Sequence, residues 1–155
     1  MTITRITQLP TGREVRPPFR RAAAQTGFRL TVDDRLGIEQ LLRQEGTRSA
    51  PNPPLLNGLL RHKLRISRGA QEPASPDLVV AGRHVTYMIS GEGARSGVLS
   101  MNPVPGAGYV PVASLLGATL IGMRKLQKVP LLRDDGQIDV VVVLDVKPLP
   151  DRDAA

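Results

Sequence analysis

Apolar residues recur at three- and four-residue steps along two segments in the first half of the chain, residues 34–44 and 55–66. This spacing places them on one face of a helix and is typical of amphipathic helices. Residues 46–54, between the two segments, contain a glycine and three prolines, which cannot continue a helix. The pattern therefore predicts a short helical hairpin over residues 28–68, whose leucine stripes pack on each other and on the rest of the protein.

Both ends of the predicted hairpin carry local signals. Phe28, Leu30 and Val32 alternate like a short strand, and Thr31 or Asp33 can cap the helix that follows. The end of the second helix is basic and comprises Arg61, Lys63, Arg65 and Arg68. Because cations near a helix C-terminus complement the helix dipole, these side chains need no nucleic-acid partner to explain them.

The second half of the chain follows a period of two, as in the alternation of Val85, Tyr87 and Ile89. In chain order we expect a linker over 69–76, a strand over 78–89, a turn over 90–97, short strands over 98–102 and 109–112, a short helix within 113–123, and a hairpin over 129–146 that turns at 134–136. The apolar run in 137–146 predicts a last strand that is buried on both faces. Helices followed by strands make the expected fold class α+β.

Composition narrows the classes of function. The 155 residues include no cysteine, which removes disulfides, thiolate metal sites and cysteine nucleophiles and favours a reducing compartment. No segment approaches the ~20 apolar residues that a membrane helix needs, so we expect a soluble, cytoplasmic protein with no membrane partner. The formal net charge of +7 attracts polyanions. Residues 1–26 contain prolines and clustered arginines, and we expect them to form a flexible basic arm.

No group of residues has the pattern of a catalytic or metal site. His62 and His84 have no carboxylate nearby in sequence to orient them, as a general base or a metal ligand requires. Asp134 and Asp135 precede Gly136 and are explained by a hairpin turn. The sequence has only two phenylalanines and two tyrosines, too few for a platform that stacks bases. We therefore expect a protein that is not an enzyme and that uses no metal or cofactor.

Residues 109–150 carry a resemblance to a known family. They resemble the closing segment of the C-terminal domain of the Gre transcript-cleavage factors and, more closely, that of the Rnk-type regulators of nucleoside diphosphate kinase. The matching positions are Ser114, the small residues Gly117 and Ala118, the run Leu120 to Gly122, and the hairpin residues Asp135 and Gly136. The resemblance implies an FKBP-like domain over residues 77–150, a curved antiparallel sheet around a short helix. The hairpin at 28–68 is similar to the short N-terminal coiled coil of the Rnk type.

The sequence departs from the family at three places. Leu115 stands where the family has proline, and Leu126 and Gln127 stand where Gly-Asp is usual. Cleavage factors carry acidic residues at the tip of a long coiled coil, where they help to hold a catalytic metal. Here Glu45 is the only carboxylate at the tip, Arg48 opposes it, and each helix is short. The resemblance therefore implies a regulator without transcript-cleavage activity.

The function implied by the resemblance is regulation of transcription by binding RNA polymerase near the secondary channel. The expected partner-binding residues are Ser114, Leu115, Gly117, Arg124 and Lys125. One alternative is a nucleic-acid-binding protein that uses the basic arm and the arginines of the hairpin. A second alternative, suggested by the fold alone, is a peptidyl-prolyl isomerase. Oligomeric state stays open.

Overall fold

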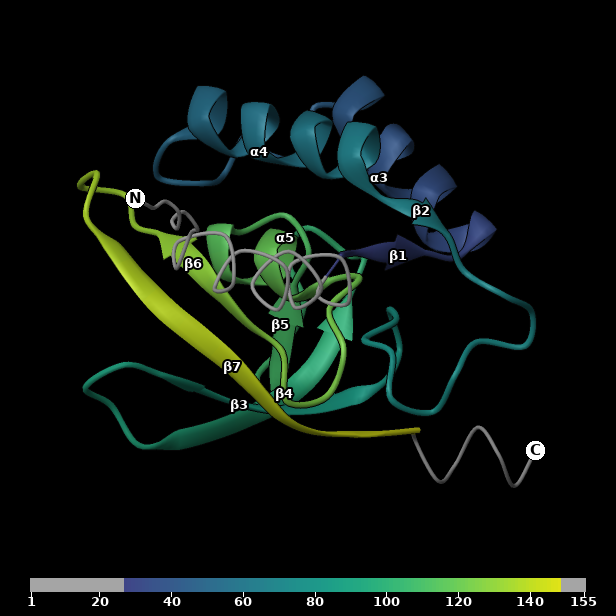
Figure 1. Ribbon diagram of the computed structural model, residues 1–155. Coiled ribbons are helices and arrows are strands. Elements are labelled where there is room, and N and C mark those ends of the chain that lie inside the picture. The colour runs from purple at the N-terminus through teal and green to yellow at the C-terminus, as the bar shows by residue number, and fades with distance from the viewer. Residues whose placement is uncertain (1–26, 149–155) are drawn as a thin grey trace, which may run out of the picture.

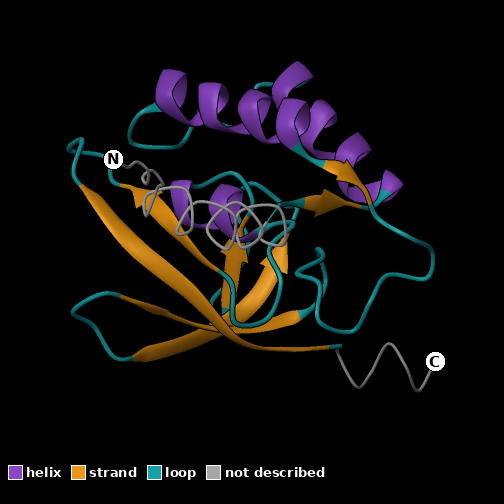
Figure 2. Ribbon diagram, in the orientation of Figure 1, coloured by secondary structure: helices purple, strands orange, loops and turns teal. Residues whose placement is uncertain are grey.

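The computed structural model describes residues 27–148. The expected basic arm at 1–26 and the last two residues of the expected domain over 77–150 lie outside the described residues. Two long helices lie side by side across one end of the molecule, a short helix lies beneath them, and a curled sheet forms the other end (Figure 1). This combination of helices with a five-stranded sheet is α+β, as predicted. Figure 2 shows the two long helices on one side of the curled sheet and the short helix within the curl of the sheet.

The helical hairpin consists of α3 (Val32–Arg43) and α4 (Pro53–Ile66). Thr31 is the N-cap of α3, and its hydroxyl oxygen accepts a hydrogen bond from the backbone N–H of Asp34. Because the N-cap fixes the start of the helix, Val32 is its first residue, and the expected strand shrinks to β1 (Arg29–Leu30). Both helices confirm the prediction that was made from the spacing of the apolar residues.

A two-stranded parallel sheet closes the base of the hairpin. β1 pairs with β2 (Arg68–Gly69), with Arg29 opposite Arg68 and Leu30 opposite Gly69. The prediction that Gly69 begins a linker was wrong, because the antiparallel helices bring the flanking residues together and their backbones pair. Both ends of the hairpin are thereby held at one place.

The main sheet has the strand order β5-β4-β3-β7-β6. Its strands are β3 (His84–Ile89), β4 (Ala94–Ser100), β5 (Tyr109–Pro111), β6 (Lys128–Leu132) and β7 (Ile138–Lys147). All neighbouring pairs are antiparallel except β4 and β5, which are parallel. The prediction of a purely antiparallel sheet was therefore wrong at this edge. After β4 the chain returns to the beginning of that strand, so β5 runs in the same direction as β4. The two strands then pair over three residues.

The turn between β3 and β4 is shorter than the sequence suggested. β4 already begins at Ala94, opposite Met88, so the expected turn over 90–97 is limited to 90–93. Gly91 adopts a φ of 82° there, as a tight turn requires. The small residues Ala94, Ser96 and Gly97 suggested a turn, but strand pairing uses the backbone and tolerates them.

The last strand is buried on one face only, which corrects the prediction for 137–146. Val141 and Val143 are fully buried, whereas Ile138 is 66% and Val140 is 44% exposed. Side chains alternate between the two faces of a strand, and the helices of the described chain cover one face of the sheet (Figure 1). The run of valines therefore does not indicate burial on both sides.

The hairpin and the sheet share one hydrophobic core. The cluster joins Leu30, Ile38, Leu56 and Leu60 of the hairpin to Leu120 and Ile121 at the end of α5 (Leu115–Leu120) and to Val141 and Val143 of β7. The hairpin thus packs on the rest of the molecule instead of projecting from it. The division into units at 28–68 and 77–150 stays a prediction.

Lys63 is buried, whereas the sequence suggested a cation at the exposed end of a helix. Its side chain is 3% exposed, and Nζ donates to the carbonyl oxygens of Thr119 (2.9 Å) and Ile121 (2.8 Å) at the end of α5. The ammonium also lies 3.7 Å from the centre of the Phe28 ring. These carbonyls lack partners within their own helix, so Lys63 joins α4 to α5. Burial lowers the pKa of Lys63 to about 7.

Asp34 makes a second polar link between the hairpin and the remainder of the chain. Its Oδ2 accepts a hydrogen bond from the backbone N–H of Ala81 at 3.3 Å. The carboxyl group is buried, and this burial raises its pKa to about 6. Asp34 therefore fixes the start of α3 against the segment that leads into β3.

Candidate protein-docking surface

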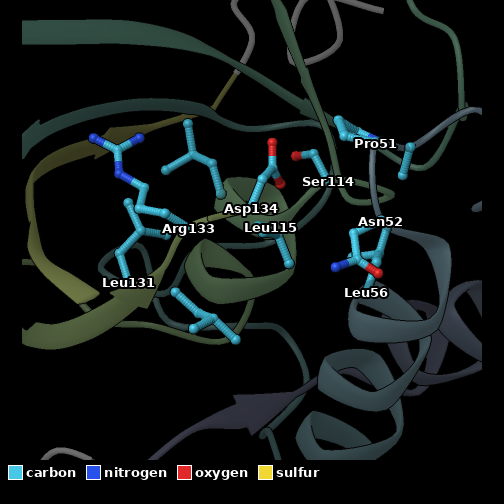
Figure 3. Close-up of a pocket in the computed structure, with 11 residues that line it drawn as sticks. Pro51, Asn52, Leu56, Ser114, Leu115, Leu131, Arg133 and Asp134 are labelled. Atoms are coloured by element: carbon cyan, nitrogen blue, oxygen red, sulfur yellow. The ribbon is translucent and has the colours of Figure 1, made fainter. Parts of the chain in front are cut away.

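A groove opens where the start of α4, the start of α5 and the end of β6 meet (Figure 3). Its volume is about 230 Å³, and Ser114 and Leu115 line it together with Pro51, Leu131 and Arg133. We call it the Ser114 groove. It combines leucine side chains with a polar rim, which is the character of a site that binds another protein.

Ser114 is the N-cap of α5. Its Oγ accepts a hydrogen bond from the backbone N–H of Gly117 (3.0 Å) and donates one to the carbonyl oxygen of Pro111 (2.7 Å). The single hydroxyl proton is therefore already used, and a partner can reach only the remaining acceptor site on the oxygen. The serine that the family resemblance singled out is thus held in a fixed orientation by the fold.

Leu115 is the first residue of α5, half-buried, and packs against the core while it lines the groove. The first helical position is the one where proline is favoured, because its N–H has no partner inside the helix. Leucine in place of the family proline is therefore compatible with the same helix start. It also adds an apolar side chain to the groove.

Gly117 lies in the interior. A Cβ atom at this position would lie 1.9 Å from the carbonyl oxygen of Pro111, so only glycine allows α5 to approach the end of β5 so closely. Gly117 is therefore placed to shape the groove from within, and it presents no side chain to a partner.

Arg124 and Lys125 lie beyond the opposite end of α5 and do not reach the groove. Arg124 forms an isolated bridge with Leu78 and lines a different pocket. Lys125 Nζ lies 3.5 Å from Asp145 Oδ1, so a carboxylate already compensates its charge. The structure thus divides the five expected residues between two ends of one helix.

Sequence reasoning missed the groove residues from the other elements. Asn52 caps α4 and accepts a hydrogen bond from the backbone N–H of Leu55 at 3.3 Å. Arg133 donates from Nε to Asp139 (2.7 Å) and from a terminal nitrogen to Glu92 (3.1 Å). The Asn-Pro-Pro sequence was a usable signal for the helix start, whereas the Arg133 network joins two hairpins and has no local signal.

The loop between α3 and α4 lies at the edge of this groove. Glu45 and Arg48 of this loop form an exposed ion pair, and the hydrogen bond from Arg48 lowers the pKa of Glu45. Within residues 27–148, no group of three or more potential metal-ligating side chains lies close enough to hold an ion. In the same part of the chain, no helix is long and apolar enough to cross a membrane.

The fold that builds this surface is similar to that of a transcription elongation factor of known structure. This structure is the elongation factor GreA/GreB from Nitrosomonas europaea, with a TM-score of 0.53 and 16% identity over 78% of this chain and 98% of that one. Gfh1, a GreA factor homolog of Thermus thermophilus, matches with a TM-score of 0.36 and 18% identity over 77% and 98%. Thermus aquaticus Gfh1 matches with a TM-score of 0.36 and 15% identity over 79% and 99%. No family model and no curated protein matches the sequence.

Proposed function

We propose that this protein is a non-catalytic transcription regulator that binds RNA polymerase near the mouth of the secondary channel through the Ser114 groove. The observation that carries this proposal is the shared fold with a GreA/GreB elongation factor, which extends over 98% of that chain. We also propose that the sheet and α5 together form an FKBP-like domain, and that the protein is more closely related to the Rnk type than to the Gre cleavage factors. In this proposal the protein acts by occupying its binding site near the secondary channel or by competing with other factors for that site.

The Ser114 groove supports the docking proposal because the fold fixes the positions of its leucine side chains. Leu115 and Leu116 are half-buried on α5, and Leu131 supports them from β6. Arg133 and Asp134 stand at the rim, where charges steer encounter and fix the register of a partner more than they add affinity.

The residues at the tip of the hairpin support the proposal that the protein does not cleave transcripts. The single carboxylate at the tip, Glu45, is paired with Arg48 through Oε1, and one carboxylate alone supplies few of the oxygen ligands that a catalytic metal needs. The hairpin also packs along the core, so its tip lies beside α5 and is not carried away from the body.

The test is retention of purified bacterial RNA polymerase by the immobilised protein at moderate salt. Ser114→Asp keeps an N-cap acceptor, because aspartate caps as well as serine, but it removes the hydrogen bond to the Pro111 carbonyl oxygen and places a charge at the groove. Ser96→Asp, at an exposed position of β4, is the matched control. We expect wild type and Ser96→Asp to retain polymerase and Ser114→Asp to lose about tenfold or more in affinity. Equal retention by all three proteins would refute docking through this groove.

Nucleic-acid binding is the second candidate function, and the exposed arginines of the hairpin favour it. Arg61, Arg65 and Arg68 are exposed, although Lys63 is not. Affinity for duplex DNA or RNA that falls steeply with salt and is unchanged in Ser114→Asp would favour this function over the first. An aromatic isomerase pocket finds less support, because Tyr87 lies in the core and Tyr109 on the surface.

A further inference from the structure

A larger groove lies between α4 and the edge strand β6, with a volume of about 500 Å³. In Figure 1, α4 lies above α5 and β6. Residues of α4, α5 and β6 line the groove together with Phe28, which precedes β1. We call it the α4–β6 groove. It shares no lining residue with the Ser114 groove.

The walls of the α4–β6 groove are apolar. Leu59 and Ile66 are seven residues apart on α4 and therefore lie on the same helix face, opposite Pro130 of β6. Ile66 is 42% exposed, which leaves a large apolar side chain in solvent. The groove can therefore receive an apolar side chain of a partner.

The polar side chains that line this groove are His62, Lys63, Thr119 and Lys128, of which both lysines are cations. The guanidinium of Arg65 lies 3.1 Å from Nδ1 of His62 and can only donate, so the proton of the neutral imidazole is on Nε2. Lys128 is exposed and forms no ion pair with residues 27–148. The charge of Lys63 likewise has no carboxylate partner in this part of the chain.

None of the described residues that line the groove is acidic. Apolar walls beside lysines that have no carboxylate partner favour a ligand that carries negative charge together with an apolar group. Residues 1–26 contain five arginines and one glutamate, so the chain's own N-terminal segment has the wrong charge to fill the groove. The groove is therefore complementary to an acidic segment that carries an apolar side chain.

We propose that the α4–β6 groove binds an acidic segment of a partner protein. One large apolar side chain of that segment lies between Leu59, Ile66 and Pro130, and its carboxylates face His62 and Lys128. This interaction does not depend on polymerase docking at the Ser114 groove.

The experiment uses the full-length protein and a panel of fluorescein-labelled acidic peptides, each with a central leucine or phenylalanine. Fluorescence anisotropy reports binding, and a second panel has serine in place of the central residue. We expect Lys128→Glu to weaken binding about tenfold, which corresponds to ~1.4 kcal/mol. Lys147→Glu, at an exposed lysine of β7, is the matched control and should bind like wild type.

Three results would overturn the proposal. The first is that no peptide of the panel binds, or that the serine peptides bind equally well, which leaves only unspecific charge attraction. The second is equal weakening by Lys128→Glu and Lys147→Glu. The third is tighter binding of a single-stranded RNA that displaces the peptides, which would assign the groove to nucleic acid. Methyl NMR shifts confined to Leu59, Ile66 and Val129 on peptide addition would place binding in this groove.

Discussion

Leu126 adopts the left-handed backbone conformation, with a φ of 71°, although it carries a side chain. For an L-residue with a Cβ this conformation costs roughly 1–2 kcal/mol. Glycine would adopt the same conformation without this cost. The Leu126 side chain is 68% exposed, so packing contributes little to offset the strain.

We therefore expect Leu126→Gly to stabilise the protein by about 1 kcal/mol, because relief of strain exceeds the added entropy of the unfolded chain. The free energy of unfolding in urea measures this change. Leu126→Ala is the matched control and should have almost no effect, since alanine keeps the Cβ. A Leu126→Gly protein no more stable than the alanine variant would show that the position is unstrained.

At the scale of elements, two helical glycines should respond in opposite ways to a methyl group. A Cβ at Gly58 in α4 meets no atom within 4 Å, whereas a Cβ at Gly117 in α5 would overlap the Pro111 carbonyl oxygen. Gly58→Ala should therefore stabilise by about 1 kcal/mol through helix propensity. Gly117→Ala should destabilise by about 3 kcal/mol, because α5 must move away from β5.

Thermal and urea unfolding of the two variants tests this contrast, and each serves as the control for the other. Destabilisation of equal size in both would mean that helix packing in α4 is tighter than the open space at Gly58 indicates. Equal stabilisation would mean that α5 can shift without cost.

Elements with strong local signals were predictable from the sequence, and those defined by distant partners were not. Helices α3 and α4 follow from leucine spacing, and Ser114 as a cap follows from residue type. The two-residue strands β1 and β2 have no period to detect, since their pairing depends on the helices between them. Lys63 continues the buried spacing of Leu56 and Leu60, a signal that its charge concealed.

The candidate site was predictable in part for the same reason. Ser114 and Leu115 lie at the start of the short helix that was expected within 113–123, but their neighbours in the groove come from α4 and β6. Arg124 is close to Ser114 in sequence, yet α5 lies between them and directs the two to different surfaces.

At the scale of the whole molecule, stability depends on pH through buried ionisable groups. Burial raises the pKa of Asp34 from 3.8 to about 6; Asp33 adds to this rise, and hydrogen bonding and Arg83 oppose it. Between about pH 4 and 6 the folded state therefore holds a proton that the unfolded state releases. The free energy of unfolding should fall as pH rises through this window, by roughly 3 kcal/mol.

Asp34→Asn should remove this fall, because asparagine keeps an oxygen acceptor for the Ala81 N–H without a charge. Urea unfolding of both proteins at several pH values measures the difference. Parallel pH profiles for wild type and variant would exclude Asp34 as the cause.

Lys63 should have the opposite effect at higher pH. Burial lowers its pKa from 10.5 to about 7, so the unfolded state binds more protons between these values. The free energy of unfolding should therefore rise with pH through this window, by roughly 5 kcal/mol. Lys63→Met should lose this rise in unfolding experiments between pH 7 and 10, and an unchanged slope would contradict the assignment.

Both edge strands of the main sheet contain a proline, Pro111 in β5 and Pro130 in β6. The backbone N–H of Val112 donates to the Ser100 carbonyl oxygen, and that of Arg133 donates to the Gln137 carbonyl oxygen. Because every second residue of an edge strand bonds to its neighbouring strand, the backbone nitrogens of Pro111 and Pro130 point outward, away from the neighbouring strands. A second chain that approached either edge would find no N–H donor at that position. Although its last strand contains four consecutive valines, the protein is thus protected against growth of intermolecular β-sheet where such growth would begin.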